Sequence, residues 1–136
     1  MGKKINVLLV DDEPDFIESM AFRLKSKGCC VNSVNSGEEA LRMIRSNPPD
    51  IVFLDILMPN MDGYTVIKLV REFNSTLPVI MMSAYEKERN VIKKTNFYGV
   101  FGFFNKEDEF SKAWNMLKSA LKIEEVNKNK NNPKIS

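Results

Sequence analysis

Short apolar runs alternate with longer amphipathic segments through most of this sequence. The apolar runs cover residues 5–10, 29–34, 51–55, 78–83 and 100–104. Each is short enough for a buried strand, and the segments between them carry apolar residues at helical spacing. Such alternation favours repeated strand–helix units with a parallel sheet over a chain of hairpins. The sequence therefore predicts an α/β fold.

The segments between the runs predict five helices. They cover residues 15–27, 36–45, 64–73, 86–97 and a last helix that begins near residue 110. Phe16, Met20 and Phe22 belong to the apolar positions of the first, and Ser36 stands three residues before Glu39, the spacing of a capping box. The segment 86–97 is charged and only weakly amphipathic, so its helix has the least support.

Composition limits the class of protein. With 136 residues, 43% of them hydrophobic, the chain can bury one substantial core, which we expect within residues 1–123. Residues 124–136 are almost entirely polar and predict a disordered tail or the start of a truncated linker. A net charge of +2 gives no reason to expect direct nucleic-acid binding.

The sequence lacks histidine, which excludes a Ser-His-Asp triad and a histidine-ligated zinc site in these residues. The two cysteines, Cys29 and Cys30, are adjacent and unsuited to an ordinary disulfide, which fits a reducing compartment. No apolar segment reaches the 18 residues of a membrane span. We expect a soluble, cytoplasmic protein with no membrane partner.

Polar residues follow four of the five predicted strands. Asp11 and Asp12 follow the first, Asp55 the third, Ser83 the fourth and Lys106 the fifth. Taken singly, each has an ordinary interpretation as a turn, a helix cap or a solvated strand end. In an open parallel sheet, however, ligands bind at the carboxyl ends of the strands, where these side chains would meet.

Together these residues suit phosphoryl transfer. Three neighbouring carboxylates repel one another, and a divalent cation with oxygen ligands, Mg²⁺ above all, would hold them ionised. Asp55, on the central strand, would then be the nucleophile toward phosphorus. The Lys106 ammonium and the Ser83 hydroxyl could stabilise the oxygens of the phosphoryl group.

The stretches "LLVDDEP", "IVFLDILMPNMDG", "PVIMMSAY" and "GVFGFFNK" make residues 4–123 resemble the receiver domain of bacterial two-component response regulators. The resemblance implies a flavodoxin-like three-layer sandwich, with a five-stranded parallel sheet in the order 2-1-3-4-5 and five helices. It implies that Asp55 accepts a phosphoryl group from the phosphohistidine of a sensor histidine kinase or a phosphotransfer protein. Phosphorylation and dephosphorylation of its own Asp55 would be the domain's only catalysis, so it would not be an enzyme.

The same resemblance assigns roles to the remaining site residues. Asp12, Asp55 and the backbone carbonyl of Leu57 would ligate Mg²⁺, and Asp11 would act largely through water. Ser83 and Phe103 would be the switch residues.

The resemblance also implies partners and one departure. A downstream protein or effector domain would bind the surface of the fourth helix, fifth strand and fifth helix, and phosphorylation could drive dimerisation. Where the family usually has proline after the lysine, commonly with a cis peptide bond, this sequence has Glu107. Since a cis bond before another residue costs about 3 kcal/mol, we expect a trans bond and a differently shaped loop.

Two other functions stay open at this point. A pseudo-receiver would keep the fold as a binding module without being phosphorylated, but the complete set of polar residues disfavours it. A haloacid-dehalogenase-like phosphatase would place its nucleophile after the first strand and a second aspartate two residues later. Here the residue two positions after Asp55 is Leu57, which argues against that enzyme.

Overall fold

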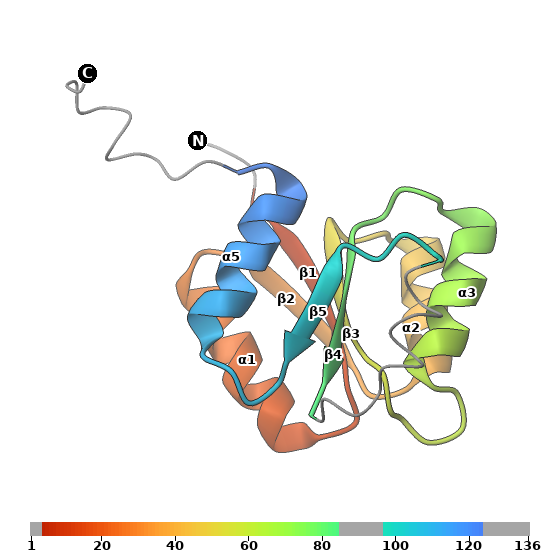
Figure 1. Cartoon of the computed structure of the whole chain (residues 1–136), viewed down its shortest axis with the longest axis horizontal. Coiled ribbons are helices and arrows are strands. Elements are labelled where there is room, and N and C mark those ends of the chain that lie inside the picture. Colours follow the sequence, from red (N-terminus) through yellow and green to blue (C-terminus); the bar gives the residue numbers. More distant parts are fainter. Residues whose placement is uncertain (1–3, 85–96, 124–136) are drawn as a thin grey trace.

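The structure is a computed structural model, and it describes residues 4–84 and 97–123. Five strands form one sheet in the order β2-β1-β3-β4-β5, and every neighbouring pair is parallel (Figure 1). The strands are β1 (Asn6–Val10), β2 (Cys30–Val34), β3 (Ile51–Asp55), β4 (Val79–Ser83) and β5 (Gly102–Asn105). The expected flavodoxin-like order is therefore confirmed.

Four helices among the described residues cover the two faces of the sheet (Figure 1). They are α1 (Pro14–Ser26), α2 (Gly37–Ser46), α3 (Gly63–Phe73) and α5 (Phe110–Leu121). Buried side chains of α1 and α5 pack with one side of the strands, and those of α2 and α3 pack with the other. The expected helix at 86–97 and the expected tail at 124–136 lie outside the described residues.

Local hydrogen bonds explain where α2 and α3 begin. The Ser36 hydroxyl accepts a hydrogen bond from the Glu39 amide at 3.2 Å, as the capping-box spacing predicts. The Asp62 carboxylate likewise accepts one from the Thr65 amide at 2.9 Å. Both helices therefore start directly after the loops that leave β2 and β3.

Two expectations about apolar residues are wrong. Phe22 does not belong to the buried stripe of α1, because its side chain is 73% exposed. Met20 and Leu24 are buried one helical turn apart, and a residue midway between them points away from the sheet. The last strand begins at Gly102 and not at Val100, and Phe101 before it is 47% exposed.

No helix within residues 4–84 and 97–123 is long and apolar enough to span a bilayer. The cytoplasmic location stays a prediction.

Candidate functional site

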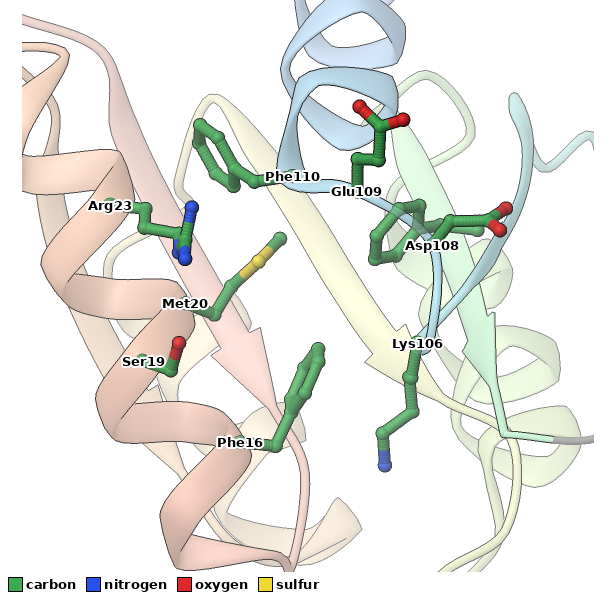
Figure 2. Close-up of a pocket in the computed structure, with 9 residues that line it drawn as sticks. Phe16, Ser19, Met20, Arg23, Lys106, Asp108, Glu109 and Phe110 are labelled. Carbon is green, nitrogen blue, oxygen red and sulfur yellow. The ribbon is translucent and has the colours of Figure 1, made fainter.

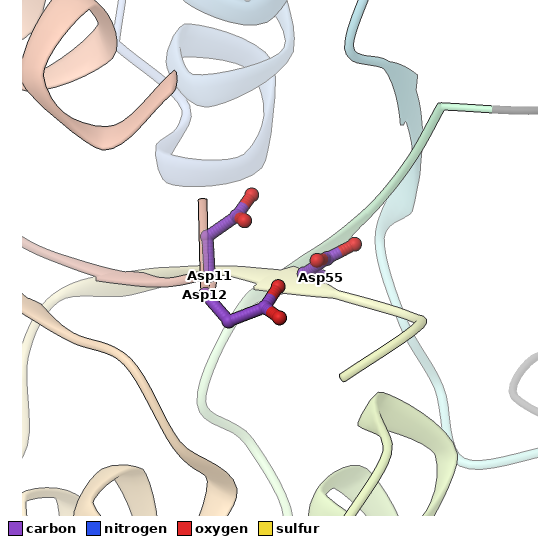
Figure 3. A group of neighbouring side chains, drawn as sticks. All are labelled: Asp11, Asp12 and Asp55. Carbon is purple, nitrogen blue, oxygen red and sulfur yellow. The ribbon is translucent and has the colours of Figure 1, made fainter. Parts of the chain in front are cut away.

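Three carboxylates meet where β1 and β3 end. The Asp11 amide continues the ladder beyond β1 by donating to the Val34 carbonyl at 3.2 Å. Asp55 is the last residue of β3 and lies opposite Met82 of β4. One carboxylate oxygen from each of Asp11, Asp12 and Asp55 lies within 4.8 Å of the others (Figure 3). The prediction that these three acids lie close together is confirmed.

The loop after β3 is held against Asp55 by a close backbone approach. The Gly63 amide donates to the Ile56 carbonyl at 2.8 Å, so the start of α3 lies against the end of β3. A Cβ atom on Gly63 would lie only 2.3 Å from the Asp55 carbonyl oxygen. Glycine is therefore required at this position to bring α3 beside the acidic cluster.

Lys106 directly follows β5, an edge strand of the sheet, and its side chain reaches the acidic cluster. Its backbone amide donates to the Ser83 carbonyl at 2.9 Å, which fixes the end of β5 beside the end of β4. Its Nζ lies 2.9 Å from an Asp11 oxygen and 3.6 Å from an Asp55 oxygen, and it donates a hydrogen bond to Glu13. With a side chain only 7% exposed, Lys106 is not a solvated strand end.

Ser83 and Leu57 border the same site. An open hollow at the carboxyl ends of the strands is lined by Asp12, Glu13, Asp55, Leu57, Ser83, Ala84 and Lys106. Ser83 is half-buried there, whereas the Leu57 side chain is 52% exposed. Phe103 lies elsewhere: it pairs with Met81 in the sheet and packs, half-buried, against the core on the α2 and α3 side.

Burial and crowding shift the charges in the site. Burial, and then the neighbouring Asp11 carboxylate, raise the pKa of Asp55 to about 7, and Lys106 offsets only part of this. Burial by itself would lower the pKa of Lys106, but its hydrogen bonds to Glu13 and Asp11, together with the negative charges of Asp55 and Asp11, outweigh burial and raise it. One ammonium thus pairs with three acidic side chains, Asp11, Glu13 and Asp55, and a fourth, Asp12, lies beside them.

The donor set fits a divalent cation with oxygen ligands. The three aspartates offer carboxylate oxygens at ligand-like separations. The buried Asp11 Oδ2 lies 2.9 Å from the Lys106 Nζ, an ammonium that also pairs with Glu13 and Asp55. A cation would offset both the burial and the Asp11 repulsion that raise the pKa of Asp55, so the residues fit Mg²⁺.

The chain turns after Lys106 without proline. The Asn105 carbonyl accepts a hydrogen bond from the Asp108 amide at 2.9 Å, and the Asn105 side chain accepts one from the Glu107 amide at 2.8 Å. No cis peptide bond occurs in residues 4–84 and 97–123, so the expectation of a trans bond is confirmed. Asn105 provides the side-chain bond that defines this loop.

Two neighbours of Lys106 were missed by the sequence reasoning, Glu13 and Phe16. The sequence pattern gives Glu13 no role in the site, and it places Phe16 only among the apolar positions of the first helix. The Phe16 ring lies 4.8 Å from the Lys106 Nζ. The available signal was the third acid of "DDEP", which precedes a proline and lies at the same edge as Asp11 and Asp12.

Comparison with known proteins agrees with this geometry. Residues 7–118 match the model of the response regulator receiver domain. The alkaline phosphatase synthesis transcriptional regulatory protein PhoP of Bacillus subtilis is 35% identical over 65% of this chain and 36% of that protein. The transcriptional regulatory protein GlrR of Escherichia coli is 30% identical over 88% of this chain and 27% of that protein.

A solved structure extends the comparison to three dimensions. The receiver domain of NtrX from Brucella abortus superposes with a TM-score of 0.79 at 25% identity, covering 87% of this chain and 99% of that one. The chain spans about a third of the length of the curated regulators it matches first.

Proposed function

Because the chain belongs to the response regulator receiver family of two-component signalling, we propose that Asp55 is its phosphoacceptor. An Asp55 carboxylate oxygen attacks the phosphorus of a phosphohistidine on a sensor histidine kinase or a phosphotransfer protein. The new O–P bond forms as the P–N bond breaks, and the imidazole nitrogen keeps the bonding electron pair. The observation that carries this proposal is the buried Lys106 ammonium 3.6 Å from Asp55, beside three clustered carboxylates.

The surrounding residues divide the remaining work. Asp12, Asp55 and the Leu57 carbonyl would hold Mg²⁺, with Asp11 acting through water, and the ion would supply charge neutralisation when bound. Lys106 provides positive charge for a phosphoryl oxygen, and the Ser83 hydroxyl donates a hydrogen bond to another. We propose no catalysis beyond the phosphorylation and dephosphorylation of Asp55 itself.

The output of the domain follows from the same site. A phosphoryl group adds about two negative charges, enough to draw the Ser83 hydroxyl toward it. We propose that this movement, with reorientation of the Phe103 ring, changes the surface near β5 and α5 that a downstream protein or effector domain contacts. Phosphorylation-dependent dimerisation through this surface is part of the proposal.

Two alternatives have weaker support. A haloacid-dehalogenase-like phosphatase needs an acid two residues after its nucleophile, and this position holds the exposed, apolar Leu57. A pseudo-receiver would not need Asp55, Asp11 and Lys106 to be buried together against the cost of desolvation.

Incubation with acetyl phosphate and Mg²⁺, followed by intact mass, tests the proposal. We expect one added phosphoryl group on the native protein, none without Mg²⁺ and none on Asp55→Asn. Undiminished addition to Asp55→Asn, or no addition to the native protein, would refute it. Sustained turnover of a generic phosphatase substrate would restore the phosphatase alternative.

A further inference from the structure

Glu13 occupies the N-cap position of α1, yet its side chain does not cap the helix. Its backbone is extended and its carbonyl accepts a hydrogen bond from the Ile17 amide at 3.1 Å, so the backbone alone starts the helix. Caps are usually made by the shorter side chains of Ser, Thr, Asp or Asn. The Glu13 carboxylate instead accepts a hydrogen bond from the Lys106 Nζ, 93 residues away in sequence.

The carboxylates around Lys106 differ in their freedom to leave it. The Asp11 side chain is fully buried and the Asp55 side chain is 6% exposed, whereas the Glu13 side chain is 60% exposed. The Glu13 carboxylate can therefore rotate away from Lys106 into water without rearrangement of the core. The Asp11 carboxylate is enclosed by the protein and cannot. Among the three partners, Glu13 is the exchangeable one.

Lys106 would stay in place after losing Glu13. The Asp11 oxygen remains 2.9 Å from its Nζ, and the Phe16 ring lies 4.8 Å away on the α1 side. Figure 2 shows Phe16 and Lys106 at the same end of the hollow between α1 and the chain that follows β5. The ammonium is thus held toward Asp55 by contacts that do not depend on Glu13.

We propose, building on the phosphoryl transfer proposed above, that Glu13 is an internal counter-ion of Lys106 that the phosphoryl group on Asp55 displaces. The Glu13 contact belongs to the unphosphorylated state, and a contact made in only one state lowers the population of the other. A phosphoryl group also repels the Glu13 carboxylate from close range. Glu13 is therefore a positioning residue that weakens the binding of phosphoryl groups at Asp55.

Binding of beryllofluoride, a phosphoryl analogue, in the presence of Mg²⁺ tests this inference by calorimetry. Since exposed ion pairs contribute modestly, we expect Glu13→Gln to bind it about two- to five-fold more tightly than the native protein. Glu18→Gln, the same change on an exposed residue of α1, should bind as the native protein does. Equal or weaker binding by Glu13→Gln, or equal tightening by Glu18→Gln, would overturn the proposal.

A second variant separates contact from charge. Glu13→Asp keeps the negative charge but shortens the side chain by one methylene, so we expect it too to bind beryllofluoride more tightly than the native protein. Native-like binding by Glu13→Asp would overturn the role of the contact. Because the Glu13 contact stabilises the unphosphorylated folded state, we expect slightly lower urea midpoints for both Glu13 variants, and a higher midpoint in either would count against the contact.

The proposed function can fail separately. If the native protein gains a phosphoryl group from acetyl phosphate while Glu13→Gln binds beryllofluoride no more tightly, only this inference is wrong. If the native protein neither gains mass nor binds beryllofluoride, the proposed function is wrong and this inference with it.

Discussion

The apolar residues of strand β3 and the acidic site at its carboxyl end contribute to the stability of the fold with opposite signs. Ile51 to Leu54 are at most 1% exposed and packed among apolar side chains, so their burial stabilises the fold. Asp55 is the next residue and is almost as buried, but it lies beside the fully buried Asp11. Burying two carboxylates costs free energy that Lys106 offsets only in part. The apolar core thus stabilises the folded state, and the acidic site at the carboxyl end of β3 destabilises it.

Removing the Phe53 ring should produce the largest change in stability. Phe53 lies in β3, and its side chain is fully buried in the part of the core that contains α1 and α5. We expect Phe53→Ala to lower the free energy of unfolding by about 3–5 kcal/mol. Phe22→Ala, at the exposed ring of α1, should change it by less than about 0.5 kcal/mol. Urea titrations measure both, and equal losses would contradict the assignment of the core.

The free energy of unfolding should depend on pH, because ionisation of the buried Asp55 destabilises the folded state. The folded pKa of Asp55 is about 7 against an ordinary value of 3.8. Between these values the folded state holds a proton that the unfolded state has released, so stability falls as pH rises through this window. Without metal we expect a loss of about 1–2 kcal/mol, less than the full shift implies because water at the open side screens the charge.

Asp55→Asn is the matched control for this measurement. It keeps the shape of the side chain and removes its titration, so the fall in stability between the ordinary pKa of 3.8 and the folded pKa of about 7 should be smaller than in the native protein. Identical pH profiles in urea titrations with chelator would show that Asp55 does not carry the cost.

Binding of Mg²⁺ should restore part of the stability that is lost when Asp55 ionises. An ion that binds only the folded state stabilises it, by about 1.4 kcal/mol at ten times the dissociation constant. We expect the thermal midpoint of the native protein to rise with Mg²⁺ at pH 8, and that of Asp55→Asn to rise much less. Sodium chloride at the same ionic strength controls for screening, because Na⁺ binds carboxylate clusters far more weakly than Mg²⁺ does. An equal rise in both proteins would place the ion elsewhere.

The turn after Lys106 should have the smallest effect. Asn105→Ala removes the acceptor of the Glu107 amide, which is exposed enough to bond to water instead. We expect a loss of about 0.5–1 kcal/mol in thermal or urea unfolding, with phosphorylation by acetyl phosphate retained. Loss of phosphorylation in a folded Asn105→Ala variant would mean that this turn also sets the position of Lys106.

The sequence was sufficient to predict features that depend on local order along the chain. Alternation of apolar runs predicted the sheet, and the place of Asp11, Asp12 and Asp55 at strand ends predicted their convergence, because parallel strands end at one edge. The Ser36 cap followed from spacing alone. Phe22 was placed wrongly because the stripe of α1 was extended to a residue on its opposite face.

Features that depend on distant contacts could not be predicted in this way. The partner of Glu13 lies 93 residues further on, so nothing nearby distinguishes this acid from a helix start. The need for Gly63 arises from the Asp55 carbonyl, and the loop after Lys106 from a side-chain bond of Asn105. Each is a consequence of packing between elements and leaves no periodic signal in the sequence.

The location of the phosphoryl group tests the central claim most directly. After incubation with acetyl phosphate and Mg²⁺, borohydride reduces an aspartyl phosphate to homoserine, and fragmentation of the peptides then identifies the modified residue. We predict homoserine at Asp55 and at neither Asp11 nor Asp12. Homoserine at another residue, or a phosphoryl group that resists borohydride, would contradict the account.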